Sequence, residues 1–237
     1  MALLTVEDIH TYVGPFHILQ GVSFKAEEDR ATVLLGRNGS GKSTLLRSIM
    51  GMAPAKSGKI WFKDEEITKL PPYKIARKGI AYIPSRRRIF SYLTVEENIK
   101  LASRNAQRSF EDRLSFVLNI FPDLKDAMKQ KARHLSGGQQ KMLLVARALI
   151  NENELLLVDE PTEGLSPLLV KRFTETFVKL KEHVTIILVE QNFKLAKEVG
   201  DDCYILDMGR TVHQGLMEDV AKDKELLKRH LGVTIES

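Results

Sequence analysis

Residues 36–44, which decide the fold of this chain, read Gly36-Arg37-Asn38-Gly39-Ser40-Gly41-Lys42-Ser43-Thr44. They follow an apolar run and precede apolar residues with helical spacing. Gly39 and Gly41 allow the backbone to turn several N–H groups inward, where they can surround an anion. The N-terminus of the following helix adds the positive end of its dipole. The spacing G-x-x-x-x-G-K-[ST] between a strand and a helix therefore predicts a phosphate-binding loop, rather than a glycine-rich turn without a ligand.

Side chains at the end of this loop have the chemistry that a nucleoside triphosphate requires. Lys42 would reach the β and γ phosphates as a point charge. Ser43 would ligate Mg2+, and Thr44 would hydrogen-bond a nearby phosphate oxygen. We therefore expect ATP and Mg2+ as ligands, with Gly36 to Thr44 as the cofactor-binding loop.

The second half of such a site should be an acidic residue at the end of a neighbouring strand. The run LLLVDE at residues 155–160 supplies Asp159, which would hold Mg2+ through water, and Glu160. Glu160 is placed to orient or deprotonate the attacking water when a phosphoryl group is transferred to water. Strands often end in acids, so the run is informative only because a phosphate loop precedes it in the same domain.

The arrangement of apolar segments predicts an α/β domain that spans residues 1–237. In the N-terminal part, VSFKAEEDRATVLL predicts two strands separated by a polar turn, and KIWFKDEEI predicts a short hairpin. Strand patterns are missing from about residue 86 to 150, which indicates an inserted α-helical subdomain. The later runs ELLLVDE, VTIILVEQ and DCYILDMG alternate with helices, one of them capped by Ser166 before Pro167. Alternation of this kind predicts a parallel sheet covered on both faces.

Composition fits a cytoplasmic globular protein. Hydrophobic residues are 43% and charged residues 28% of the 237, and the net charge is +5. No run of 18 or more apolar residues could cross a membrane, and the N-terminal residues do not resemble a secretory signal. The one cysteine, Cys203, is predicted to be a buried, inert thiol. Arg86, Arg87 and Arg88 are interpreted as a solvated loop, and we expect no nucleic-acid partner.

The run Leu135-Ser136-Gly137-Gly138-Gln139 stands before an apolar helix and ahead of LLLVDE. Its serine and the N–H groups of a helix N-terminus can bind an anion. With this run the chain resembles ABC (ATP-binding cassette) ATPases, which have a P-loop NTPase core, an N-terminal antiparallel β portion and an inserted helical subdomain.

In that family two cassettes form a head-to-tail sandwich. The resemblance therefore implies that Ser136, Gly137, Gly138 and Gln139 bind the nucleotide on the partner's phosphate loop. It also implies that Tyr12 stacks on adenine, whereas without the motifs this residue would be interpreted as a core or surface tyrosine.

Four further runs resemble the LivF-type ATPase of branched-chain amino-acid importers: AYIPSRRRIFSYLTVEENI, DEPTEGLSPLLV, IILVEQN and the terminal HLG. The chain departs from the family at three functional positions. Ser85 stands where most ABC ATPases have a glutamine near the metal and LivF-type members a glutamate. Ser166 replaces an aspartate, and Gln191 replaces the histidine that contacts the γ-phosphate. These departures predict that the chain's own site hydrolyses ATP more slowly than its partner's.

The resemblance implies an importer subunit on the inner face of the cell membrane. Its partners would be a second ABC ATPase, either a different chain or a second copy, transmembrane permease subunits and a substrate-binding protein. Residues 86–130 are expected to dock on the permease through the apolar residues Ile89, Phe90, Tyr92 and Leu93.

Three other functions remain open. One is a urea or amide importer, and another is a regulatory cassette that binds ATP without turnover. The third, a soluble ABC protein acting on ribosomes or DNA, is disfavoured because the chain has one cassette and no sustained heptads.

Overall fold

The N-terminal sheet in the computed structural model, which describes residues 1–85, 89–103 and 109–232, is antiparallel. Its strand order is β2-β1-β4-β5. The strands are β1 (Ala2–Val13), β2 (Phe16–Glu27), β4 (Ser57–Phe62) and β5 (Glu65–Glu66). This confirms the antiparallel N-terminal portion and the predicted KIWFKDEEI hairpin. The polar turn after β2 leads into a strand of the other sheet.

The second sheet has the order β10-β9-β3-β8-β7-β6. Its strands are β3 (Ala31–Leu35), β6 (Ile80–Ile83), β7 (Leu155–Asp159), β8 (Thr185–Val189), β9 (Asp202–Asp207) and β10 (Arg210–Leu216). Strands β9, β3, β8, β7 and β6 are parallel, and β10 runs antiparallel to β9. Every residue of β3, β7 and β8 is buried, as expected for strands covered on both faces. The strand β10 was not predicted, because RTVHQGL combines polar residues with few buried positions.

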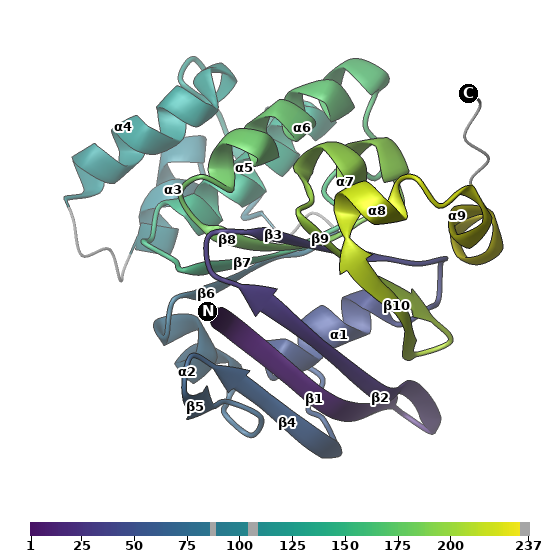
Figure 1. The fold of residues 1–237 in the computed structure, drawn as a ribbon. Coiled ribbons are helices and arrows are strands. Elements are labelled where there is room, and N and C mark those ends of the chain that lie inside the picture. The colour runs from purple at the N-terminus through teal and green to yellow at the C-terminus, as the bar shows by residue number, and fades with distance from the viewer. Residues whose placement is uncertain (86–88, 104–108, 233–237) are drawn as a thin grey trace.

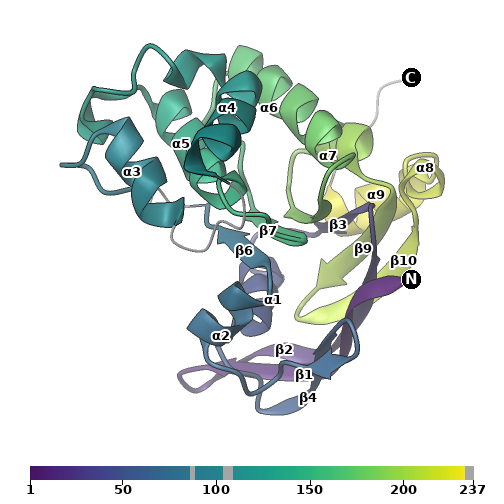
Figure 2. The same cartoon turned by 90° about the vertical axis from the view of Figure 1, so that its left-hand side faces the viewer.

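Helices cover both faces of the parallel sheet (Figures 1 and 2). They are α1 (Lys42–Ile49), α2 (Pro72–Arg77), α3 (Val95–Ala102), α4 (Phe110–Ile120), α5 (Gly137–Leu149), α6 (Pro167–Leu180), α7 (Phe193–Val199), α8 (Met217–Val220) and α9 (Lys224–Leu231), with 3-10 turns at Pro122–Leu124 and Ala132–His134. None of the helices in the described ranges is long and apolar enough to cross a membrane.

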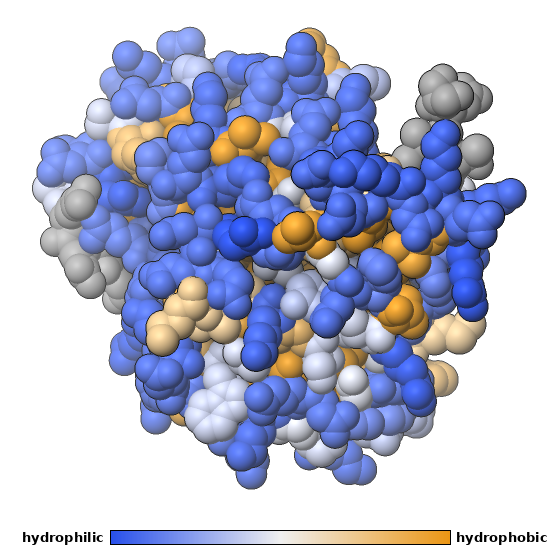
Figure 3. Space-filling model, viewed as in Figure 1, coloured by the Kyte–Doolittle hydropathy of each residue, from blue (hydrophilic) through white to orange (hydrophobic). Residues whose placement is uncertain are grey.

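Two hydrophobic cores lie on opposite faces of the parallel sheet. One contains apolar residues of α1 together with those of β1, β2 and β4, so α1 lies between the two sheets (Figure 2). The other joins the opposite face of the sheet to α3–α7. Cys203 is fully buried in this second core, and burial raises the pKa of its thiol to about 12. Polar residues cover most of the outer face seen in Figure 3.

The region between β6 and β7 contains α3, α4 and α5 and no strand among its described residues. Figure 1 shows α3 and α4 at the left-hand side of the molecule, and both contribute buried residues to the core that contains α5. A helical subdomain at residues 86–150 stays a prediction as a unit, and the three arginines at its start lie outside the described residues. Ser166 precedes α6 as predicted, but its side chain makes no capping hydrogen bond.

Candidate active site

The loop between β3 and α1 requires glycine at two positions. A Cβ atom on Gly36 would lie 2.3 Å from the carbonyl oxygen of Leu206 and 2.6 Å from Ser40 Oγ. A Cβ on Gly41, whose φ is +102°, would lie 2.9 Å from a methyl group of Leu19. The loop therefore folds tightly against β2 and β9, as a backbone that surrounds an anion must.

Lys42 is the buried cation of this loop. It is 4% exposed, and its Nζ donates to the carbonyl oxygens of Gly36 at 2.8 Å and Arg37 at 3.1 Å. The same Nζ lies 3.5 Å from Glu160 Oε1. Burial lowers the pKa of Lys42, and the nearby Glu160 carboxylate opposes this shift. Ser40 Oγ, buried in the same loop, has no hydrogen-bond partner among the described residues, which suits a group that binds a phosphate oxygen.

Asp159 at the end of β7 joins the phosphate loop to the sheet edge. Its Oδ1 accepts from the Ser43 hydroxyl at 2.8 Å, and its Oδ2 accepts from the Tyr82 hydroxyl at 3.0 Å. Burial raises the pKa of Asp159, and these two hydrogen bonds oppose the shift. Tyr82 was missed by sequence reasoning, since nothing in AYIP distinguishes a tyrosine of the core from one at the site.

The donor set fits Mg2+, which prefers hydroxyl, carboxylate and water oxygens. Ser43 and Asp159 place two such oxygens in contact. Ser85 lines the same cavity of about 1260 Å³, together with Tyr82 and Glu160. The structure thus brings the three predicted metal-site residues to one cavity.

Glu160 has a left-handed backbone, with φ at +44°. Its N–H donates to the carbonyl oxygen of Val189 at 2.9 Å, which fixes this conformation against β8. Non-glycine residues held in this region are strained, and such strain is frequent at functional sites. The side chain is directed to Lys42 and to Gln191, whose Nε2 donates to Glu160 Oε1 at 2.7 Å.

Gln191 also reaches the phosphate loop. Its Nε2 donates to Asn38 Oδ1 at 2.5 Å as well as to Glu160. Lys42, Glu160 and Gln191 follow β3, β7 and β8, so neighbouring parallel strands deliver them to one edge of the sheet.

The run Leu135–Gln139 lies at the N-terminus of α5, outside the cavity that contains Ser43 and Asp159. Ser136 caps the helix: its Oγ accepts from the N–H of Gln139 at 3.3 Å, and its own N–H donates to Gln139 Oε1 at 3.0 Å. A Cβ on Gly138 would lie 2.6 Å from Leu169, so α5 and α6 pack closely here. Residues 136–139 do not line the cavity that contains Ser43 and Asp159. The N–H groups of Gly137 and Gly138, in the first turn of α5, have no acceptor within the helix.

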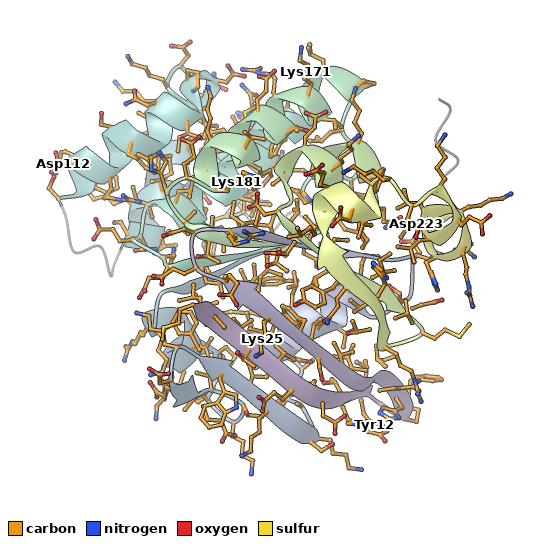
Figure 4. The ribbon with its side chains drawn as sticks, in the orientation of Figure 1. Tyr12, Lys25, Asp112, Lys171, Lys181 and Asp223 are labelled. Carbon is orange, nitrogen blue, oxygen red and sulfur yellow. The ribbon has the colours of Figure 1, made fainter. Side chains whose placement is uncertain are left out.

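Tyr12 lies at the end of β1, at the tip of the β1–β2 hairpin (Figure 4). Its ring stacks on His17 with centroids 4.3 Å apart, and Lys56 Nζ lies 4.9 Å from its centroid. The adjacent Thr11 points the other way, toward α1, where its Oγ1 lies 2.9 Å from Ser48 Oγ. The strand register shifts between Thr11 and Tyr12, so the direction of Thr11 does not determine that of Tyr12. Adenine stacking by Tyr12 stays a prediction.

Phe16 is a second exposed aromatic residue of this hairpin, with 68% of its surface exposed. The residues that follow in β2 lie beside the phosphate loop: a Cβ on Gly41 would lie 2.9 Å from Leu19 Cδ2 and 3.6 Å from Ile18 Cγ2. Sequence reasoning did not single out Phe16.

Arg37 and Thr44 are the remaining polar residues of the loop. Arg37 donates to the carbonyl oxygen of Arg229 at 3.4 Å, which connects the loop to the end of α9. Thr44 lies in the first turn of α1, and its carbonyl oxygen accepts from Ser48 Oγ at 2.9 Å.

Comparisons with known proteins agree with this geometry. The family model described as ABC transporter matches residues 19–163. The chain is 40% identical over 220 residues to the probable branched-chain amino acid transport ATP-binding protein LivF of Archaeoglobus fulgidus, a match that covers 92% of this chain and 93% of that protein. It is 30% identical over 247 residues to the probable LivG protein of the same organism, covering 98% and 96%. A solved nucleotide-free ATP-binding cassette from an ABC transporter has a TM-score of 0.86 at 25% identity, covering 99% of this chain and 100% of that one. The chain therefore belongs to the ABC transporter family, as one of its ATP-binding subunits with ATPase activity.

Proposed function

We propose that this chain drives an importer of branched-chain or other hydrophobic amino acids by hydrolysing ATP at the edge of its parallel sheet. The observation that carries the catalytic part is the position of Glu160. Its Oε1 lies 3.5 Å from Lys42 Nζ and 2.7 Å from Gln191 Nε2, next to the part-buried Ser43–Asp159 pair. A carboxylate between a phosphate-binding cation and a hydrogen-bond donor is positioned to orient or deprotonate an attacking water.

The loop residues divide the remaining tasks. Backbone N–H groups of Gly36 to Thr44 surround the phosphates, and Lys42 neutralises charge on the β and γ phosphates. Ser43, Asp159 (through water) and Ser85 would hold the metal. When bound, Mg2+ would neutralise phosphate charge. Gln191 would donate a hydrogen bond to the γ-phosphate, without the positive charge that a histidine can carry.

A second cassette completes the unit that we propose. Ser136, Gly137, Gly138 and Gln139 stand at the N-terminus of α5, away from this chain's own phosphate loop, so they would bind the partner's nucleotide. The similarity to both a LivF and a LivG protein of one organism supports a partner that is a different, LivG-like chain. Two cassettes of different sequence would give two sites of unequal activity.

The substrate class follows from the relatives, because permease and binding-protein subunits select what is transported. The 40% identity to a LivF protein over nearly the whole chain supports branched-chain amino acids. We place the permease contact at the start of the region 86–130. Phe90 and Tyr92 are 48% and 75% exposed there, each with an arginine over its ring. Ile89 packs against the core instead, and Leu93 is half-buried.

Uptake by whole cells tests this function. Deleting the gene should abolish uptake of radiolabelled leucine, isoleucine and valine, and wild-type chain should restore it. The Glu160→Gln variant, produced at the same level, should restore it only in part. Unchanged amino-acid uptake in the deletion strain, together with lost urea or amide uptake, would assign the chain to the alternative importer. Full rescue by Glu160→Gln would instead favour a regulatory cassette.

A further inference from the structure

Glu190 is a buried carboxylate with no role in the scheme above. It follows the last residue of β8, is 3% exposed, and directly precedes Gln191. An ionised carboxylate this deep is costly unless several donors bind it. Burial raises the pKa of Glu190, while hydrogen bonds from Thr162, Asn192 and Gln191 oppose the shift.

The two oxygens of this carboxylate hold two different loops. Oε1 accepts from Thr162, both from the hydroxyl at 2.6 Å and from the N–H at 3.3 Å. Oε2 accepts from the N–H groups of Gln191 at 3.0 Å and Asn192 at 3.1 Å. Thr162 belongs to the loop that follows Glu160, whereas Gln191 and Asn192 begin the loop that follows β8. The carboxylate therefore joins the two segments that contribute the reacting side chains.

This connection bears on the contact between Glu160 and Gln191. That contact is a single hydrogen bond of 2.7 Å between two side chains, each with rotatable bonds. Its geometry depends on where the backbones of the two loops lie relative to each other. Glu190 fixes both backbones, with four hydrogen bonds in a site from which water is excluded.

We propose that Glu190 is a positioning residue for ATP hydrolysis, which holds the loop of Glu160 in register with the loop of Gln191. The inference rests on the proposed role of Glu160. Glu190 would act through these two side chains and would not touch the nucleotide. Its removal should therefore slow turnover without weakening nucleotide binding to the same extent.

The chemistry of the site explains why a carboxylate is needed. All four groups that face Glu190 are donors, and a carboxylate offers only acceptors. The amide of Glu190→Gln would keep one oxygen for one loop but turn an N–H2 group toward the donors of the other. The substitution preserves size and shape, so it breaks one side of the connection with little change in packing.

The test uses the complex that carries this chain, captured from its own host through an affinity tag on the chain. The partner cassette of this complex carries the change that matches Glu160→Gln, so that turnover and the dissociation constant for MgATP report this chain's own site in each variant. We expect Glu190→Gln to lower kcat about tenfold or more and to change the dissociation constant by less than about threefold. Thr162→Val, which removes only the hydroxyl donor, should lower kcat about threefold or more, and Thr162→Ser should stay within about twofold of wild type.

Coupling to Gln191 separates positioning from general stabilisation. In a Gln191→Ala background, Glu190→Gln should lower kcat by less than about twofold, because the side chain that it positions is gone. A kcat within about twofold of wild type for Glu190→Gln overturns the inference. Equal losses for Thr162→Val and Thr162→Ser overturn it too, and this pair remains informative if Glu190→Gln does not fold. If Glu160→Gln leaves turnover unchanged, the proposed role of Glu160 is wrong. That result differs from the two outcomes that overturn the role of Glu190.

Discussion

The amide of Gln191 donates to Oε1 of Glu160 at 2.7 Å, across the gap between the ends of β8 and β7. The same amide nitrogen contacts Asn38 of the phosphate loop. A residue that follows β8 thus contacts both the candidate base and the loop that binds phosphate. A neutral amide makes this contact where most of the family has a histidine, and a charge-assisted hydrogen bond would be about twice as strong.

This relationship predicts that the two sites of a heterodimer contribute unequally. In a reconstituted transporter, we expect Glu160→Gln in this chain to lower transport less than the matching change in the partner cassette. The physical reason is that Ser85 is too short to replace a glutamine, and Gln191 cannot carry positive charge. MgATP affinity measured on each purified variant is the control, since it should not change. A larger loss from the variant in this chain would reverse the predicted asymmetry.

The buried charge of Asp159 should cost stability when no nucleotide is bound. Asp159→Asn keeps an oxygen for Ser43 and presents an amide to the Tyr82 hydroxyl, which can accept as well as donate. We expect the nucleotide-free variant to gain about 0.5–2 kcal/mol in free energy of unfolding. The melting temperature would rise by about 2–4 °C for each kcal/mol in a chain of this size.

The sign of the pH dependence follows from the raised pKa of Asp159. The carboxyl of Asp159 ionises more readily in the unfolded chain, where its pKa is 3.8, than in the folded chain. The ionised carboxylate therefore lowers the free energy of unfolding, and this cost is present at neutral pH. The penalty disappears as the pH falls, and the difference between wild type and Asp159→Asn should shrink with it. Asp126→Asn, at an exposed carboxylate, is the matched control. Thermal scans at several pH values that show Asp159→Asn to be less stable than wild type would contradict this prediction.

Cys203 should be inert in the folded chain. Its thiol is fully buried and has a pKa of about 12, so at about pH 8 the thiolate is present in about one molecule in 10,000. A thiol reagent should label the native protein only at its unfolding rate, and label one thiol per chain in denaturant. In the unfolded chain the thiol of Cys203 has a pKa near its ordinary value of 9.0. The stability that the buried neutral thiol contributes is therefore present below pH 9.0 and falls as the pH rises above it. Rapid labelling of native protein at neutral pH would contradict the burial.

Base stacking should depend on Phe16 more than on Tyr12. Stacking on an aromatic ring contributes about 1–3 kcal/mol per base, so Phe16→Ala should weaken ATP binding about fivefold or more. Tyr12→Ala should change it by less than about twofold, since its ring already stacks on His17. Calorimetric titration of both variants with MgATP distinguishes the two rings. A larger loss for Tyr12→Ala would restore the stacking role that the sequence suggested for it.

The sequence predicted the fold class and the family, because three motifs appear in one order and each is local. Gly36–Thr44, Leu135–Gln139 and Asp159–Glu160 need only their own residues and the adjoining strand or helix to be recognised. The antiparallel N-terminal portion was predicted from the resemblance to the family, and only the KIWFKDEEI hairpin was predicted from its own residues. The burial of Cys203 was predicted from the apolar residues around it in the sequence.

Contacts between distant segments could not be predicted. Tyr82 lies 77 residues from Asp159 in sequence. The hydrogen bond from its hydroxyl to Asp159 can be recognised only when β6 is known to pair with β7. Glu190 looks like an ordinary acid after a strand until Thr162 is placed beside it. The face taken by Tyr12 depends on the hairpin geometry around residues 11–18, where the strand register shifts.

Calorimetric titration of the purified chain with MgATP tests the central claim most directly, that the loop from Gly36 to Thr44 binds the phosphates. Wild type should bind, and Lys42→Ala should bind at least about tenfold more weakly, a loss of about 1.4 kcal/mol, because the variant lacks the buried ammonium beside Gly36 and Glu160. Lys222→Ala, which removes an exposed lysine near the end of the sequence, should bind like wild type. Equal affinity of wild type and Lys42→Ala for MgATP would contradict the account.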